Sequence, residues 1–212
     1  MNEQDHLNTL SEIKQLMERS SRFLSLSGLS SILIGIYALA GVGTAYWYLD
    51  TQSMDAGRYF TQFSGSSFEQ FKTLIPFFIG DAVLVLILSI ITTYLFTQRL
   101  SMKQGMKHWD PAAKRLLLNL CIPLVTGGLY SLILIKHQRI DLILSSMLIF
   151  YGMALLNASH HTRTEIRHLG ILEVLLGLLA ALYSDYGLLF WAIGFGGLHI
   201  VYGFLFYFKY ER

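Results

Sequence analysis

The segment from Glu165 to Arg212 constrains the fold most strongly, because it holds two long apolar runs joined only by Ser184-Asp185-Tyr186. Each run is long enough to cross a bilayer as an α-helix, which takes about 20 apolar residues. Since the connection is so short, the two helices must be antiparallel neighbours. The segment therefore predicts a membrane-spanning hairpin.

The rest of the chain alternates in the same way between apolar blocks and short polar gaps. Of its 212 residues, 53% are hydrophobic and only 14% are charged, whereas a soluble domain has about 25% charged residues. We predict an all-α polytopic membrane bundle with one membrane domain, residues 23–212. Its six transmembrane helices are expected at about 23–49, 74–97, 112–135, 140–156, 166–183 and 187–208.

Residues 1–22 differ from these blocks, because they are polar with one apolar face. Thr9 and Glu12 have the spacing of a capping box ahead of apolar residues that recur every three or four positions. This pattern predicts an N-terminal amphipathic helix on the membrane surface, and a helix that binds a partner or a second copy is the alternative. The acidic residues of this segment argue against a cleavable signal peptide.

The basic residues predict the orientation. If residues 1–22 are cytoplasmic, the non-cytoplasmic segments hold only four of the 16 Lys and Arg residues, namely Arg58, Lys72, Lys136 and Arg139. This asymmetry agrees with the positive-inside rule and places both termini in the cytoplasm. The basic cytoplasmic loops are expected to contact anionic lipid headgroups.

Small residues recur along the predicted spans. Ser27, Ser31 and Gly35 are four apart, a spacing that lets another helix approach closely. Gly35-Ile-Tyr-Ala-Leu is echoed by Gly128-Leu-Tyr-Ser-Leu and by Gly177-Leu-Leu-Ala-Ala-Leu, and Tyr151-Gly152 is echoed by Tyr202-Gly203. These echoes favour three hairpin repeats, although glycine-rich helices also resemble one another by chance.

The same stretches carry a family resemblance. The pattern EVLLGLLA…YGLLFWAIGFGGLHIVYG, together with SRFLSLSGLSSILIGIYAL, resembles a family of small six-span membrane proteins from Bacteroidota. The hairpin pattern is also loosely similar to the HdeD-type acid-resistance membrane proteins. The first resemblance implies no activity. The second implies a bacterial inner (cytoplasmic) membrane protein with a stress-related role and no catalytic residues.

Three ionisable residues lie inside predicted spans: Glu173, His199 and Asp81. Such residues are costly in hydrocarbon and are candidates for function. At about 1.5 Å per residue, Glu173 and His199 lie at similar depth, roughly 10–12 Å from the cytoplasmic side. They could form a structural pair that sets helix register, or a proton site for transport or sensing. Asp81 is expected level with Ser145 and Ser146 and near Tyr130, as a carboxylate bonded by hydroxyls or as a station on a polar path.

Other site classes have less support. His161, Glu165 and His168 have helical spacing that could bind a divalent metal, but nearby Arg163 and Arg167 repel cations, so we predict no metal site and no cofactor. A net charge of +2 and the lack of a basic, aromatic-rich patch argue against nucleic-acid binding. The single cysteine, Cys121, excludes an intrachain disulfide.

An intramembrane serine protease is the enzyme to consider, with Ser145 or Ser146 and His199. The G-x-S-G motif is absent, and the estimated depths differ by about 9 Å. We therefore predict a non-enzymatic membrane protein with a regulatory, stress-related or assembly role, and a homo-oligomer is among the expected assemblies. The alternative is a small proton-coupled transporter or permease that uses Glu173, His199 and Asp81.

Overall fold

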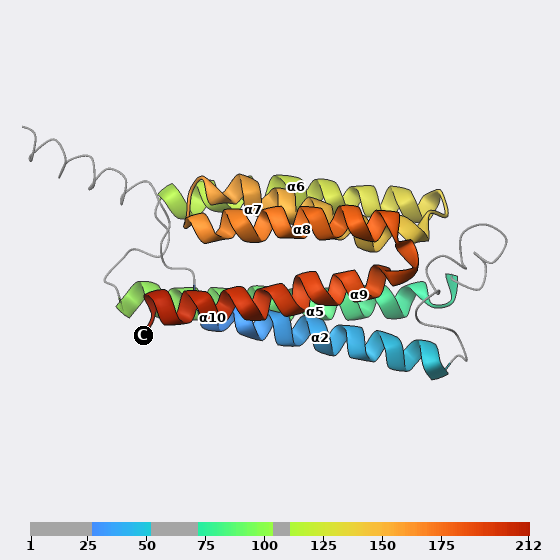
Figure 1. Ribbon diagram of the computed structural model, residues 1–212, viewed down its shortest axis with the longest axis horizontal. Coiled ribbons are helices and arrows are strands. Elements are labelled where there is room, and N and C mark those ends of the chain that lie inside the picture. The colour runs from blue at the N-terminus through green and yellow to red at the C-terminus, as the bar shows by residue number, and fades with distance from the viewer. Residues whose placement is uncertain (1–26, 52–71, 104–110) are drawn as a thin grey trace, which may run out of the picture.

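The computed structural model describes residues 27–51, 72–103 and 111–212, and within these ranges the chain is helical with no strand (Figure 1). The predicted helix over residues 1–22 lies outside the described residues. The elements, in chain order, are α2 (Gly28–Thr51), α5 (Ile75–Lys103), α6 (Pro111–Lys136), η1 (Ile140–Leu142), α7 (Ile143–Ser159), α8 (Thr164–Leu182), η2 (Ser184–Tyr186), α9 (Gly187–Trp191), the π-helix η3 (Ala192–Leu198) and α10 (His199–Tyr210).

Five helical stretches in the described part of the chain are long and apolar enough to cross a membrane. They are Gly28–Thr51, Ile75–Lys103, Ala112–Lys136, Ile140–Ser159 and Ser184–Tyr210. This confirms an all-helical chain with the composition of a multi-pass membrane protein. Helix α8 is the sixth long helix, but its 19 residues include Glu165, Arg167 and Glu173. Its charge makes it a weaker candidate by composition, so the number of spans stays a prediction.

The helices form two groups of three, which Figure 1 shows as two layers. Helix α7 lies between α6 and α8 in one group, and α2 contacts both α5 and α10 in the other. The groups meet where α9 and η3 contact α7 and α8. The end of the chain therefore joins the two groups, because η2 turns it from α8 in one layer into α9 in the other.

At the two central interfaces, glycines let one helix approach the backbone of the next. A Cβ at Gly35 would lie 2.6 Å from the carbonyl oxygen of Gly196, and a Cβ at Gly152 would lie 2.7 Å from that of Gly170. Ser31 also donates a hydrogen bond of 2.9 Å to the carbonyl of His199. The predicted close approach along Ser27, Ser31 and Gly35 is confirmed, and the neighbouring helix is the η3–α10 stretch.

The glycine echoes do not share one environment. Gly35 and Gly177 both meet backbone atoms of a neighbouring helix, whereas a Cβ at Gly128 would find nothing within 4 Å. In α6 the close contact falls on Gly127 instead, which lies against the ring of Phe150. The three-hairpin repeat therefore stays a prediction.

Helix α2 is capped by a residue from the far end of the chain. The Ser27 hydroxyl donates to the Glu211 carboxylate at 3.2 Å, and the backbone N–H of Gly28 donates to the same carboxylate. A carboxylate satisfies the free N–H groups of a helix start and complements its dipole. This contact ties the start of α2 to the end of α10.

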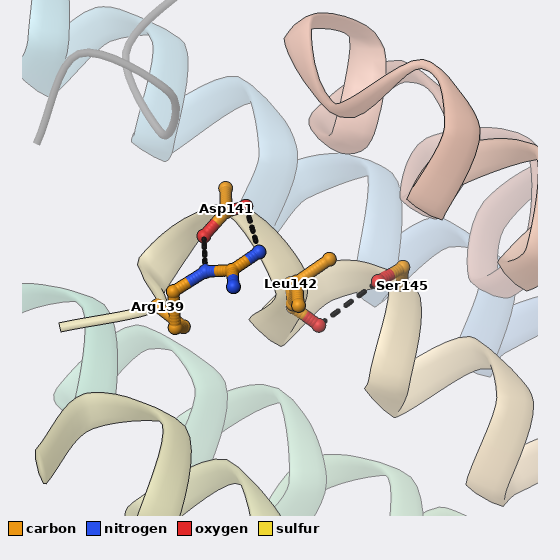
Figure 2. Close-up of polar contacts among 4 residues, drawn as sticks. All are labelled: Arg139, Asp141, Leu142 and Ser145. Atoms are coloured by element: carbon orange, nitrogen blue, oxygen red, sulfur yellow. Dashed lines mark hydrogen bonds and ion pairs between the residues drawn. The ribbon is translucent and has the colours of Figure 1, made fainter. Parts of the chain in front are cut away.

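The turn between α6 and α7 is closed by local hydrogen bonds. Gln138 has a positive φ of 59°, and the backbone N–H of Arg139 donates to Leu134, as in a Schellman motif. The Arg139 guanidinium then makes two hydrogen bonds to Asp141, at 3.1 and 3.0 Å (Figure 2). Figure 2 also shows Ser145 bonded to the carbonyl of Leu142, at 2.9 Å.

Candidate functional site

Glu173 and His199 lie together in the interior, where α8 faces the junction of η3 and α10. Glu173 Oε1 is 3.6 Å from His199 Nδ1, and the two side chains are 0% and 4% exposed. The predicted proximity of these residues is confirmed. It follows from the short η2 turn, because residues at equal distances before and after a short turn lie side by side on the two helices that it connects.

The π-helix shapes the space between them. Its wider turn places the Gly194 carbonyl oxygen 3.1 Å from His199 Nδ1, and single π-turns of this kind are frequent at functional sites. A Cβ at Gly194 would lie 2.5 Å from Glu173 Oε2 and 2.6 Å from Leu148 Cδ2. Glycine at this position is therefore what lets the carboxylate approach the helix.

Tyr151 of α7 completes the cluster. Its hydroxyl oxygen is 2.6 Å from His199 Nε2, and its ring lies 5.4 Å from the imidazole between centroids. Because Nδ1 faces a carbonyl oxygen, Nδ1 carries a proton, and Nε2 of the neutral ring accepts from the tyrosine. Sequence reasoning missed this role, because Tyr151-Gly152 was interpreted only as part of a repeat.

Glu173 lacks a hydrogen-bond donor among the described residues. Neither of its carboxylate oxygens has a partner, although the side chain is fully buried. Burying an unpaired charge costs several kcal/mol, so such a group shares or binds a proton or keeps an opposite charge beside it. His199 is the neighbour that can exchange a proton with Glu173. The cluster Glu173–His199–Tyr151 is hereafter the buried polar cluster.

Aromatic rings pack beside this cluster. The ring centroid of Phe195 is 4.8 Å from that of Tyr151 and 4.8 Å from that of Trp191. These apolar faces shield the imidazole, which lies 6.1 Å from Phe195. An apolar wall strengthens every electrostatic contact inside it, because water is kept away.

Asp81 occupies a different place from the one expected. The predicted neighbours were Ser145, Ser146 and Tyr130, but the hydroxyl that bonds Asp81 is that of Thr44, at 2.9 Å. The reason is that α5 packs along α2, which carries Thr44. Ser145 and Ser146 instead donate to backbone carbonyls one turn earlier, at 2.9 and 2.8 Å. Hydroxyl bonding of Asp81 is therefore confirmed, with another partner.

The three residues weighed as metal ligands do not converge. Among the described residues, no three His, Cys, Asp or Glu side chains are grouped so that they could hold a metal ion. Glu165 instead accepts hydrogen bonds from Lys209 at 2.5 Å and from Tyr210 at 2.7 Å. The guanidinium of Arg163 lies 3.5 Å above the ring of Tyr210. These contacts join the start of α8 to the end of α10.

This junction gives a prediction about acid stability. Burial opposes ionisation of Glu165, but the hydrogen bonds from Lys209 and Tyr210 outweigh it and lower its pKa to about 2. A lowered pKa adds stability above the unfolded value of about 4.3, and that stability disappears as the pH falls toward 2. We expect E165Q to melt about 2–4 °C below wild type from pH 8 to pH 5, a loss of about 1 kcal/mol.

The measurement is thermal unfolding of both proteins in detergent at pH 7, 4 and 2.5. The gap between the two melting temperatures should close at the lowest pH. A gap that stays the same at pH 2.5 would contradict the prediction.

Comparison of the chain with protein-family models, with curated proteins and with solved structures gave no significant match. The assignment of function therefore rests on the residues and on the geometry described above.

Proposed function

We propose that this chain is a six-span integral membrane protein with a non-enzymatic role in regulation, stress response or assembly. The proposed location is a bacterial inner membrane with both termini cytoplasmic, in line with the basic loops and with the resemblances noted above. In this proposal α8 is the fifth span. Its one deeply placed charge, Glu173, faces His199 and not lipid, which reduces the cost of inserting the helix.

The observation that carries the proposal is the separation of the intramembrane polar groups. Glu173 lies beside His199 where α8 faces α10, and His199 is bonded to Tyr151 of α7, whereas Asp81 accepts a hydrogen bond from Thr44 on the α2–α5 pair. A permease that used all three would need them along one path. Two local clusters instead favour a role in holding helices together, with Glu173 and His199 as a register-setting pair.

The serine-protease alternative gains no support from these contacts. The His199 ring nitrogens face Tyr151 and Gly194. Ser145 and Ser146 are bonded to backbone carbonyls of their own helix segment. A serine nucleophile needs a base within hydrogen-bond reach, so we propose that the chain is not an enzyme of this class.

A proton-coupled permease is the second candidate, and one observation favours it. Both oxygens of the buried Glu173 lack a donor in the described part of the chain, as expected of a group that binds and releases a proton. Among the residues that the structure describes, the charged or titratable groups that face it are His199 from α10 and Tyr151 from α7. The two candidates therefore differ in what Glu173 does.

A proton-flux assay separates the two functions. Wild type and E173Q are reconstituted into liposomes that enclose a pH-sensitive dye, with an imposed pH gradient. The proposed function predicts that the two proteins dissipate the gradient no faster than empty liposomes. Flux in wild type that E173Q abolishes would overturn it in favour of the permease.

A further inference from the structure

A groove runs along the last turns of α10, beside the first turn of α8. Its volume is about 690 Å³. Its wall is apolar and includes Val201, Phe204, Leu205 and Phe208, each about half exposed, while Lys209 and Glu165 lie at one end. Figure 1 shows this end of α10 level with the start of α8.

The polar end of the groove carries exposed basic side chains. Lys209 is 62% exposed on its side chain, and the Arg212 guanidinium lies 5.8 Å from the ring of Phe208. Exposed Arg167 follows one turn into α8. The two nearby carboxylates are engaged: Glu165 bonds Lys209, and Glu211 bonds the start of α2.

Lys209 keeps capacity for another anion. An ammonium group has three donors, and Glu165 accepts from one of them. From Val201 to Lys209 the helix rises about 12 Å, about four fifths of the thickness of one leaflet of a hydrocarbon core of about 30 Å. An apolar groove of this length that ends in cations has the dimensions and charge of a phospholipid site.

We propose that this groove binds one anionic phospholipid. An acyl chain lies along Val201, Leu205 and Phe208, and the phosphate is held by Lys209 and Arg212. Charge complementarity selects an anionic headgroup, since the cation of a choline headgroup would be repelled by the same two side chains. The inference rests on the proposed membrane location. The basic loops are expected to contact anionic headgroups, and the groove is one defined site for such a contact.

The test counts lipids on the full-length protein. Delipidated protein in detergent is titrated with phosphatidylglycerol or phosphatidylcholine, and bound lipids are counted by native mass spectrometry. Wild type should hold one phosphatidylglycerol about fivefold more tightly than phosphatidylcholine. K209Q should lose this preference, and K209R should keep it. The matched control is K114Q, which removes an exposed lysine from the first turns of α6 and should change nothing.

A second variant separates lipid binding from a structural role of the Glu165–Lys209 contact. E165Q frees the ammonium, so it should bind phosphatidylglycerol as well as wild type or more tightly. Equal losses in E165Q and K209Q would overturn the proposal, and so would an equal loss in K114Q or equal retention of the two lipids.

Glycerol 3-phosphate should not displace the lipid, and full displacement would show a phosphate site that does not use the groove, which overturns the proposal. Dimers that form in place of the lipid adduct would assign the groove to a second copy and also overturn it. The flux assay has a separate readout, so the failure of the proposed function would be distinguished from the failure of this site.

Discussion

Replacing His199 with alanine is expected to lower the free energy of unfolding by about 3 kcal/mol, or on the order of 10 °C in melting temperature. The imidazole is the polar neighbour of Glu173 Oε1 at 3.6 Å and the partner of the Tyr151 hydroxyl at 2.6 Å. Removing the imidazole leaves the Glu173 carboxylate and the Tyr151 hydroxyl in the interior without their polar neighbour. Thermal unfolding in lipid nanodiscs measures the effect.

The matched control is H168A, because His168 lies on the same bundle but is exposed. It should melt within about 1 °C of wild type, since exposed substitutions cost less than about 0.5 kcal/mol. E173Q should also melt below wild type at every pH if the pair is structural. An E173Q protein as stable as wild type, with a smaller dependence of stability on pH, would contradict the structural interpretation.

Replacing Gly152 with alanine is expected to cost about 2–3 kcal/mol. The new Cβ would lie 2.7 Å from the carbonyl oxygen of Gly170 and 2.7 Å from the backbone nitrogen of Val174. Backbone atoms cannot rotate away as a side chain can, so α7 and α8 must separate. Because the buried polar cluster spans these helices, the same separation should weaken the contact between Tyr151 and His199.

G128A in α6 is the control for this prediction, because a Cβ there would meet nothing within 4 Å. Alanine is a better helix former than glycine by about 1 kcal/mol, so G128A should be neutral or slightly more stable. Unfolding by heat in nanodiscs measures both variants. Equal melting temperatures for G152A and G128A would show that the α7–α8 contact is not as close as described.

The helices themselves could be predicted from the sequence, because the length of an apolar run and the residues that begin or end a helix are local features. The expected spans 112–135 and 187–208 correspond to α6 (Pro111–Lys136) and to the stretch that ends with α10 at Tyr210. The expected start at 112 lies one residue after the helix start that the structure places at Pro111. Helix α5 continues past the expected end at 97 to Lys103, because its last turns are polar but remain helical.

The candidate site could be predicted only in part. Glu173 and His199 were placed together because one short turn, Ser184–Tyr186, connects their helices and equalises their depths. Tyr151 lies 48 residues before His199, and depth alone does not say which faces of two distant helices meet. The partner of Asp81 was predicted wrongly for the same reason, since a depth estimated along one helix does not identify the helix beside it.

The sequence by itself therefore determined the helical class, the positions of the described helices and the apolar composition. Only the tertiary structure decided which helices are neighbours: α2 beside α10, α7 between α6 and α8, and α5 against α2. The physical reason is that an apolar surface gains nothing by choosing one apolar neighbour over another in hydrocarbon. The choice depends on shape, on glycines that admit a backbone carbonyl and on a few polar contacts, and these exist only once the helices are packed.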